Sequence, residues 1–123
     1  MAYLHDDILD AACSYISTNT ENLYITSAEA TTYAEAQTTY KLGTKATPGF
    51  TGPANGDVSG RKITVDAITD GSVGGTDTAT HWALTDNSET KLLATGALDS
   101  SQGVTSGNTF TLEAFDIEFP DPA

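Results

Sequence analysis

Residues 80–98, THWALTDNSETKLLATGAL, contain the pattern that decides the fold. Trp82 and Leu84 are apolar positions in a stretch that alternates with period two, as a β-strand with one buried face does. The polar cluster at residues 86–89, DNSE, favours a tight turn, and a second apolar phase begins at Leu92. This stretch therefore predicts a β-hairpin with Trp82 in the core.

The rest of the central sequence extends this β pattern. Ala94 and Leu98 share a phase with Gly96, which predicts a bend or a close backbone approach there. Threonine makes up about a sixth of the chain and suits a pleated surface because it is β-branched. Further short strands, each with one buried face, are indicated at residues 23–26 and 63–67. The sequence predicts a mainly β, single-domain antiparallel β-sandwich or small barrel.

One amphipathic helix is expected before the first strand, within residues 1–19. Asp6 and Asp7 lie in its early turns, where negative charge favours the positive end of the helix dipole. Cys13 is placed on a polar or lateral side. At about 100° per residue, the predicted packing face consists of Leu4, Ile8, Ala11 and Tyr15, with Ala12 and Ile16 at its margin.

Two segments lack a clear period. Residues 27–40 favour a helical turn around residues 33–36, followed by a strand near Lys41. Residues 48–60, PGFTGPANGDVSG, predict a loop because they are rich in Gly and Pro. We therefore expect one domain over residues 1–123, with the helix at 1–19, a β body at 20–119 and a tail at 120–123.

The C-terminal stretch TFTLEAFDIEF, residues 109–119, contains two apolar sets in opposite phases. A regular strand cannot direct both sets to one face. A β-bulge near Ala114 would restore the inward direction. Alternatively, the second set forms an arm that contacts another subunit or a larger shell, before Pro120 and Pro122 end the pairing. The predicted contact residues of this arm are Phe115, Ile117 and Phe119.

Composition excludes several classes of partner. Five Lys and Arg against 17 Asp and Glu give a net charge of −12, which disfavours nucleic acid and anionic lipid. A single cysteine cannot form an internal disulfide, and no Cys/His set has zinc spacing. The start, MAYLHDDILDAA, is acidic where a secretory signal would be basic, and no apolar run reaches membrane length. We expect a protein made and assembled in a cytoplasm, without a membrane partner.

No catalytic signature, cofactor motif or metal-binding motif is present. His5 and His81 lack a partner at catalytic spacing, with His5 at the edge of the helix stripe and His81 on the outward face of its strand. Asp70 and Asp77 could offer oxygens to calcium, but solvated turn residues explain them as well. The chain is therefore expected not to be an enzyme and to need no cofactor.

Several motifs together resemble a family of small virion proteins of tailed bacteriophages. They are YLHDDILDAA, SGRKITVDAITDGSV, THWALTD, KLLATGAL and SSQGVTSGNTFTLEAFDIEFPDP. The similarity is one of pattern over nearly the whole chain, and residues 48–56 fit it least. The resemblance implies a structural component of the particle, most plausibly a capsid decoration or cement protein.

That resemblance implies a place in the virion, assembled in the bacterial host cytoplasm, with the major capsid protein or another virion protein as partner. Self-association is also expected, with a homotrimer favoured. The negative charge suits a protein on the outside of a DNA-filled shell. The alternative is a tail or fibre module that binds host carbohydrate through exposed aromatic side chains.

Overall fold

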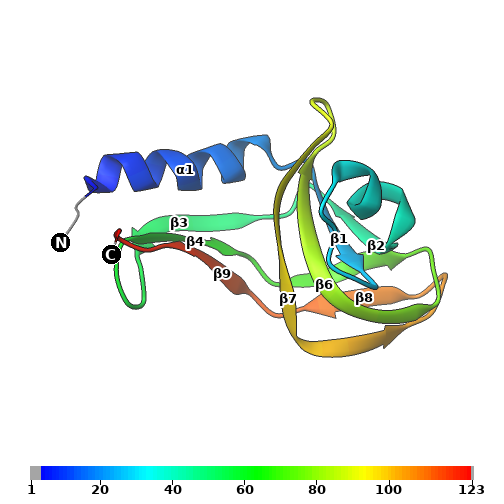
Figure 1. The fold of residues 1–123 in the computed structure, drawn as a ribbon. Coiled ribbons are helices and arrows are strands. Elements are labelled where there is room, and N and C mark those ends of the chain that lie inside the picture. Colours follow the sequence, from blue (N-terminus) through cyan, green and yellow to red (C-terminus); the bar gives the residue numbers. More distant parts are fainter. Residues whose placement is uncertain (1–3, 123) are drawn as a thin grey trace. The chain divides into compact units, whose positions relative to one another are not determined.

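The computed structural model describes residues 4–122, which form two compact units (Figure 1). Unit 1 contains the residues up to Asn19, Gly49–Ala67 and the residues from Glu113 onward. Unit 2 contains Thr20–Pro48 and Ile68–Leu112. Part of the predicted β body therefore groups with the helix, and the single domain over residues 1–123 stays a prediction. Residues 120–122 of the predicted tail are neither helix nor strand.

Unit 2 is an antiparallel six-stranded half-barrel. Its core holds large side chains from several strands, including the buried Leu23, Leu84 and Phe110. In sheet order, the strands are β7 (Lys91–Val104), β6 (Asp77–Asp86), β1 (Asn22–Thr26), β2 (Lys41–Ala46), β5 (Ile68–Val73) and β8 (Thr109–Leu112).

The predicted hairpin is confirmed: β6 and β7 pair antiparallel and are connected by a turn at residues 87–90. Trp82 is buried and lies opposite Gly96 in the register. A Cβ atom at Gly96 would lie 2.6 Å from the indole ring, so the ring occupies the space of the missing side chain. The close approach at Gly96 is therefore made by a side chain and not by a neighbouring backbone, which differs from the prediction.

Strand β1 and residues 82–86 of β6 are buried on both faces, which differs from the single buried face predicted for them. Residues 27–40 cause the difference, because Ala30 and Ala36 of this segment pack on Tyr24 and Ala83. The segment forms the expected helical turn, here the π-helix η1 (Glu35–Thr39), and β2 then begins at Lys41 as predicted.

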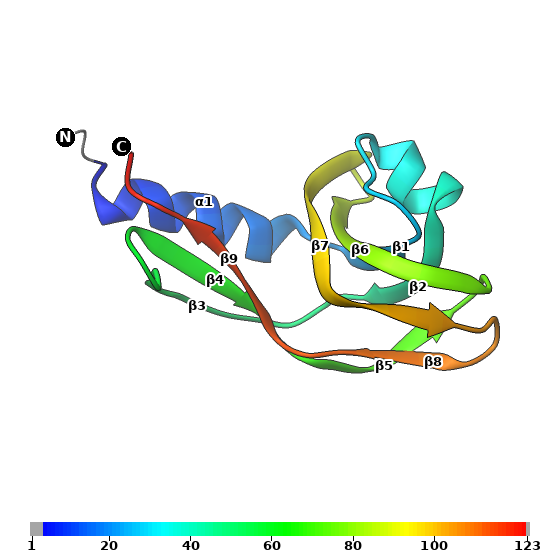
Figure 2. The same ribbon diagram turned by 60° about the horizontal axis from the view of Figure 1, so that its bottom comes forward.

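Unit 1 combines one helix, α1 (Asp6–Asn19), with a three-stranded antiparallel sheet. The sheet order is β3 (Phe50–Asn55), β4 (Arg61–Val65) and β9 (Phe115–Phe119), with β4 in the middle (Figure 2). The fold class predicted from the sequence is thus confirmed: mainly β, antiparallel, with one N-terminal helix.

The prediction of a loop at residues 48–60 is wrong for the first half of this segment, which forms β3 and pairs with β4. The register shifts between Thr51 and Ala54, so Gly52 and Pro53 lie in an irregular part of an edge strand. Proline lacks an N–H group and is tolerated at such a position. The Gly and Pro content therefore marked a bulge rather than a loop.

The predicted packing face of the helix is also wrong. Leu9, Cys13 and Ile16 are the buried residues of α1, which packs against β4 and β3. Ile8 and Tyr15 are 56% and 48% exposed. Of the remaining predicted residues, Leu4 is half-buried and Ala11 is exposed. Residues 1–3 of the predicted helix lie outside the described part of the chain.

An ion pair explains the orientation of α1. The Asp10 carboxylate lies 2.7 Å from Nε of Arg61 in β4. This partner comes from a distant part of the sequence, and the ion pair forms in the orientation in which a second apolar stripe, Leu9, Cys13 and Ile16, faces the sheet. Cys13, placed laterally by the sequence argument, is consequently buried, and this burial raises the pKa of its thiol.

Candidate functional site

The two apolar sets of residues 109–119 belong to two strands in two different sheets. β8 ends at Leu112 in the half-barrel, and β9 begins at Phe115 in the three-stranded sheet. A bulge within one continuous strand is therefore the wrong explanation. The phase changes because Glu113 and Ala114 form a break at which the chain passes from one unit to the other.

The predicted contact residues of β9 lie on the face of their sheet that carries α1. Phe115, Ile117 and Phe119 pair directly with Val65, Ile63 and Arg61. Directly opposed residues of antiparallel strands share a face, and Arg61 reaches α1 from that face. While Ile63 and Val65 in the central strand are buried, the three β9 side chains at the edge are only half-buried.

The exposed apolar side of α1 points toward β9. Asp10 is directed to the opposite flank, because its partner Arg61 also donates a 2.7 Å hydrogen bond to Asn55 of β3. Ile8 precedes the buried Leu9, whereas Asp10 follows it, and successive helical residues are about 100° apart. Ile8 therefore lies on the flank away from β3.

Tyr15 lies on the same flank as Ile8, two turns along the helix, because seven residues bring the chain back to nearly the same direction. These helix and strand residues are therefore directed to the same side of unit 1 and define one candidate surface there. We call it the α1–β9 surface, defined by Ile8, Tyr15, Phe115, Ile117 and Phe119.

The other face of the same sheet is polar and acidic. Nζ of Lys62 lies 2.7 Å from an Asp57 oxygen and 3.0 Å from an Asp116 oxygen. The hydrogen bond to Asp57, followed by that to Asp116, raises the pKa of Lys62 to about 12. A 2.7 Å bond from the Thr64 hydroxyl and the Lys62 ammonium lower the pKa of Asp116. The Lys62 ammonium thus pairs with two carboxylates, and Glu118 of β9, which lies opposite Lys62, places a third carboxylate on this face.

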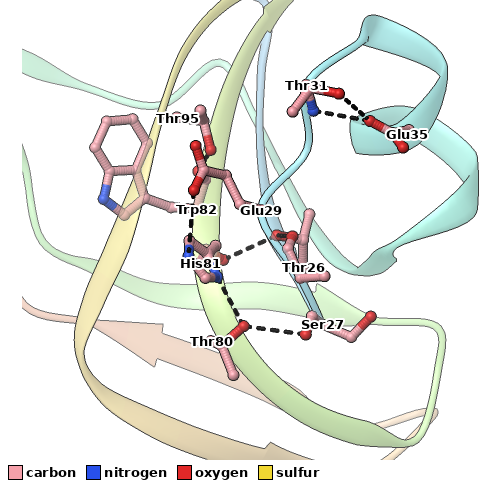
Figure 3. A network of polar contacts seen from close by, with 10 residues as sticks. Thr26, Ser27, Glu29, Thr31, Glu35, Thr80, His81, Trp82 and Thr95 are labelled. Atoms are coloured by element: carbon pink, nitrogen blue, oxygen red, sulfur yellow. Dashed lines mark hydrogen bonds and ion pairs between the residues drawn. The ribbon is translucent and has the colours of Figure 1, made fainter.

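A polar network around His81 is the strongest candidate for chemistry in unit 2 (Figure 3). Nδ1 of His81 lies 2.8 Å from the Thr80 hydroxyl, and Nε2 lies 4.0 Å from a Glu29 oxygen. The Thr80 hydroxyl donates to the Ser27 carbonyl at 3.1 Å, so its proton is directed away from the imidazole. The network joins residues 27–29 to β6 and does not form an activated nucleophile.

The other candidates from the sequence have structural partners. His5 precedes the helix, is exposed, and accepts a 3.1 Å hydrogen bond from the Asp7 backbone N–H. Asp70 pairs with Lys45 at 3.0 Å, and Asp77 accepts from the Thr78 N–H at 2.7 Å. Within residues 4–122, no group of three or more His, Cys, Asp or Glu side chains could hold a metal ion.

Sequence reasoning missed a pair of carboxyl groups at the start of β1 and the end of β6. Glu21 and Asp86 share a hydrogen bond. Hydrogen bonds from the Ser88 side chain and from the Ser88 N–H, the latter at 2.7 Å, lower the pKa of Glu21, and the bond with Asp86 adds to this effect. The shared bond to Glu21 and the burial of Asp86 raise the pKa of Asp86. Only the pairing of β1 with β6, which sets Asn22 opposite Thr85, brings the two residues together, so no local pattern signals them.

Replacing Asp86 with asparagine is expected to raise the melting temperature by a few degrees near pH 7. A raised folded-state pKa means that the stabilising effect of protonated Asp86 is lost as the pH rises through that pKa. The asparagine amide can donate to Glu21 without a charge, and its oxygen can still accept from the Glu89 N–H. The gain should shrink as the pH falls to about 4, the range where carboxyls become protonated.

Thermal unfolding followed by circular dichroism at both pH values measures this effect. Asp99→Asn is the matched control, because it removes the same charge from an exposed position of β7. An equal gain for both variants, or a gain for Asp86→Asn that is independent of pH, would contradict the shared proton.

Comparison with known proteins finds no match to a family model, a curated protein or a solved structure. No helix within residues 4–122 is long and apolar enough to cross a membrane. The α1–β9 surface is therefore the candidate functional site, on the strength of its exposed apolar side chains alone.

Proposed function

We propose that this protein is a non-enzymatic structural component of a bacteriophage particle, specifically a decoration or cement protein that binds the outer head surface. The α1–β9 surface is proposed to attach it to the major capsid protein or another virion protein. The motif resemblance and the net charge of −12 support this role. Self-association into a trimer stays a separate prediction of the sequence.

The observation that carries the proposal is the exposure of apolar side chains beside half-buried ones. Ile8 and Tyr15 are 56% and 48% exposed, and Ile117 and Phe119 on the same face of unit 1 are half-buried. Apolar side chains left exposed on one side of a small protein are typical of a contact with another protein. Trp82 is buried against Gly96, which removes this residue as a stacking platform for the carbohydrate-binding alternative.

Labelling of purified particles tests the proposal directly. An antibody raised against this chain should decorate the heads of particles of the virus that encodes it, as seen by electron microscopy. Particles from a virus in which the gene is deleted are the control and should show no label. Label on the tail alone would favour the fibre-type alternative, and particles without label would overturn the virion role altogether.

A further inference from the structure

We propose that the outer edge of β9 accepts an extended segment of a different polypeptide as an additional strand. In this segment, the residues facing α1 are apolar and the alternate residues are Lys or Arg. The inference deepens the proposed function and rests on it, because it specifies the chemistry of the partner at the α1–β9 surface.

β9 offers a regular strand edge. In the sheet order β3, β4, β9, no further strand of residues 4–122 pairs with the outer side of β9. Its register with β4 is unbroken over all five residue pairs, whereas the pairing of β3 is interrupted between Thr51 and Ala54. Alternate N–H and C=O groups along Asp116–Phe119 therefore point away from the sheet, as an added strand requires.

At this edge, residues of β9 and α1 would cover the apolar side of an added strand. Its inward residues would lie next to Ile117 and Phe119, which are half-buried, and in front of the exposed flank of α1. Ile8 and Tyr15 would then lose much of their exposure. Strand pairing and apolar burial would thus occur together, on the same face of unit 1.

The charges on the opposite face select the partner. Asp116 and Glu118 alternate with the apolar residues of β9, and the Lys62 ammonium is already held by Asp57 and Asp116. Lys or Arg opposite these carboxylates would form favourable cross-strand pairs. A second copy of this chain, paired antiparallel about Ile117, would instead place Asp116 opposite a glutamate. Edge-to-edge pairing of two copies is therefore disfavoured, and a basic partner is favoured.

Two synthetic peptides test this inference with the full-length protein. One alternates Lys and Val, and the other alternates Glu and Val. In ¹H–¹⁵N NMR titrations, the Lys–Val peptide should shift the amide signals of Asp116–Phe119 and of Ile8 and Tyr15. It should also slow hydrogen exchange at alternate β9 amides, and the Glu–Val peptide should do neither.

A charge-neutral variant provides the second arm. Asp116→Asn with Glu118→Gln keeps the shape of both side chains and should weaken binding of the Lys–Val peptide by about tenfold, as expected for the loss of two cross-strand charge pairs. Glu113→Gln with Asp99→Asn removes the same total charge from exposed positions outside β9 and should leave binding unchanged. Circular dichroism confirms that both variants fold.

Several results would overturn the inference. They are equal binding of the two peptides, binding of the Lys–Val peptide away from β9, and equal loss of binding in the two variants. Sedimentation of the free protein as a dimer with protected β9 amides would identify a second copy as the occupant and reject the basic partner. Particle labelling is independent of all these results, so failure of the inference is distinguishable from failure of the proposed function.

Discussion

Replacing Gly71 with valine is expected to lower the free energy of unfolding of unit 2 by about 3 kcal/mol. Gly71 lies directly opposite Phe110 in the pairing of β5 with β8. A Cβ atom at Gly71 would overlap the ring of Phe110. The same ring lies 2.9 Å from the position of a Cβ at Gly43 on β2. The Phe110 ring therefore packs directly on two glycines of neighbouring strands. It cannot move toward the sheet to make room for a larger side chain at Gly71.

The size of this effect follows from the burial of Phe110, which is 2% exposed. A valine at Gly71 would push the ring out of the core of the half-barrel. Overpacking of a core costs about 1–3 kcal/mol, and loss of a buried phenylalanine costs about 3–5 kcal/mol. Urea unfolding followed by the fluorescence of Trp82, the single tryptophan and a residue of unit 2, measures the change.

Two controls separate the steric clash from a general effect of removing glycine. Gly103→Ala in β7 should be nearly neutral, because a Cβ there would meet nothing within 4 Å. Phe110→Ala should lower stability by itself, but Gly71→Val should then cost much less on that background. Additive losses in the double variant would show that the Phe110 ring is not the reason for the glycine.

The sequence predicts the parts of this fold that depend on neighbouring residues. The hairpin of β6 and β7 follows from an alternating pattern around a polar turn, and the burial of Trp82 against Gly96 follows from its phase. The helical turn before Lys41 is predicted from residues 33–36 alone, although the segment around them has no clear period. In each case, propensity and pattern within a short stretch determine the structure.

Features that depend on distant residues were predicted wrongly. The packing face of α1 depends on the ion pair between Asp10 and Arg61, and the helix carries two apolar stripes of similar strength. The second buried face of β1 depends on the segment that contains Ala30 and Ala36.

The candidate site was predicted in part. Phe115, Ile117 and Phe119 were identified by their phase, and their position on the α1 face of the sheet fits a contact role that stays a prediction. The contribution of Ile8 and Tyr15 is not predicted, because the helical periodicity places these residues in the interior. Their exposure becomes visible only when the rotation of the helix is known.

Replacing Tyr15 with glutamate is expected to weaken attachment to the particle by about thirtyfold or more. Tyrosines in the centre of an interface commonly contribute about 2 kcal/mol, which corresponds to that factor, and a buried carboxylate adds a further penalty. Tyr15 suits this test better than Ile117, which is half-buried opposite the fully buried Ile63. An acid at Ile117 would also weaken the unit itself, whereas one at the exposed Tyr15 should leave the melting temperature nearly unchanged.

Co-sedimentation with particles that lack this chain measures the attachment. Ser14→Glu is the matched control, because it introduces a carboxylate on the same helix, at an exposed position about 100° from Tyr15. That variant should attach as the parent protein does, since Ser14 lies outside the α1–β9 surface. If both variants attach equally well, the contact lies elsewhere on the molecule. If both fail equally, the negative charge of the helix, rather than the apolar flank formed by Ile8 and Tyr15, controls attachment.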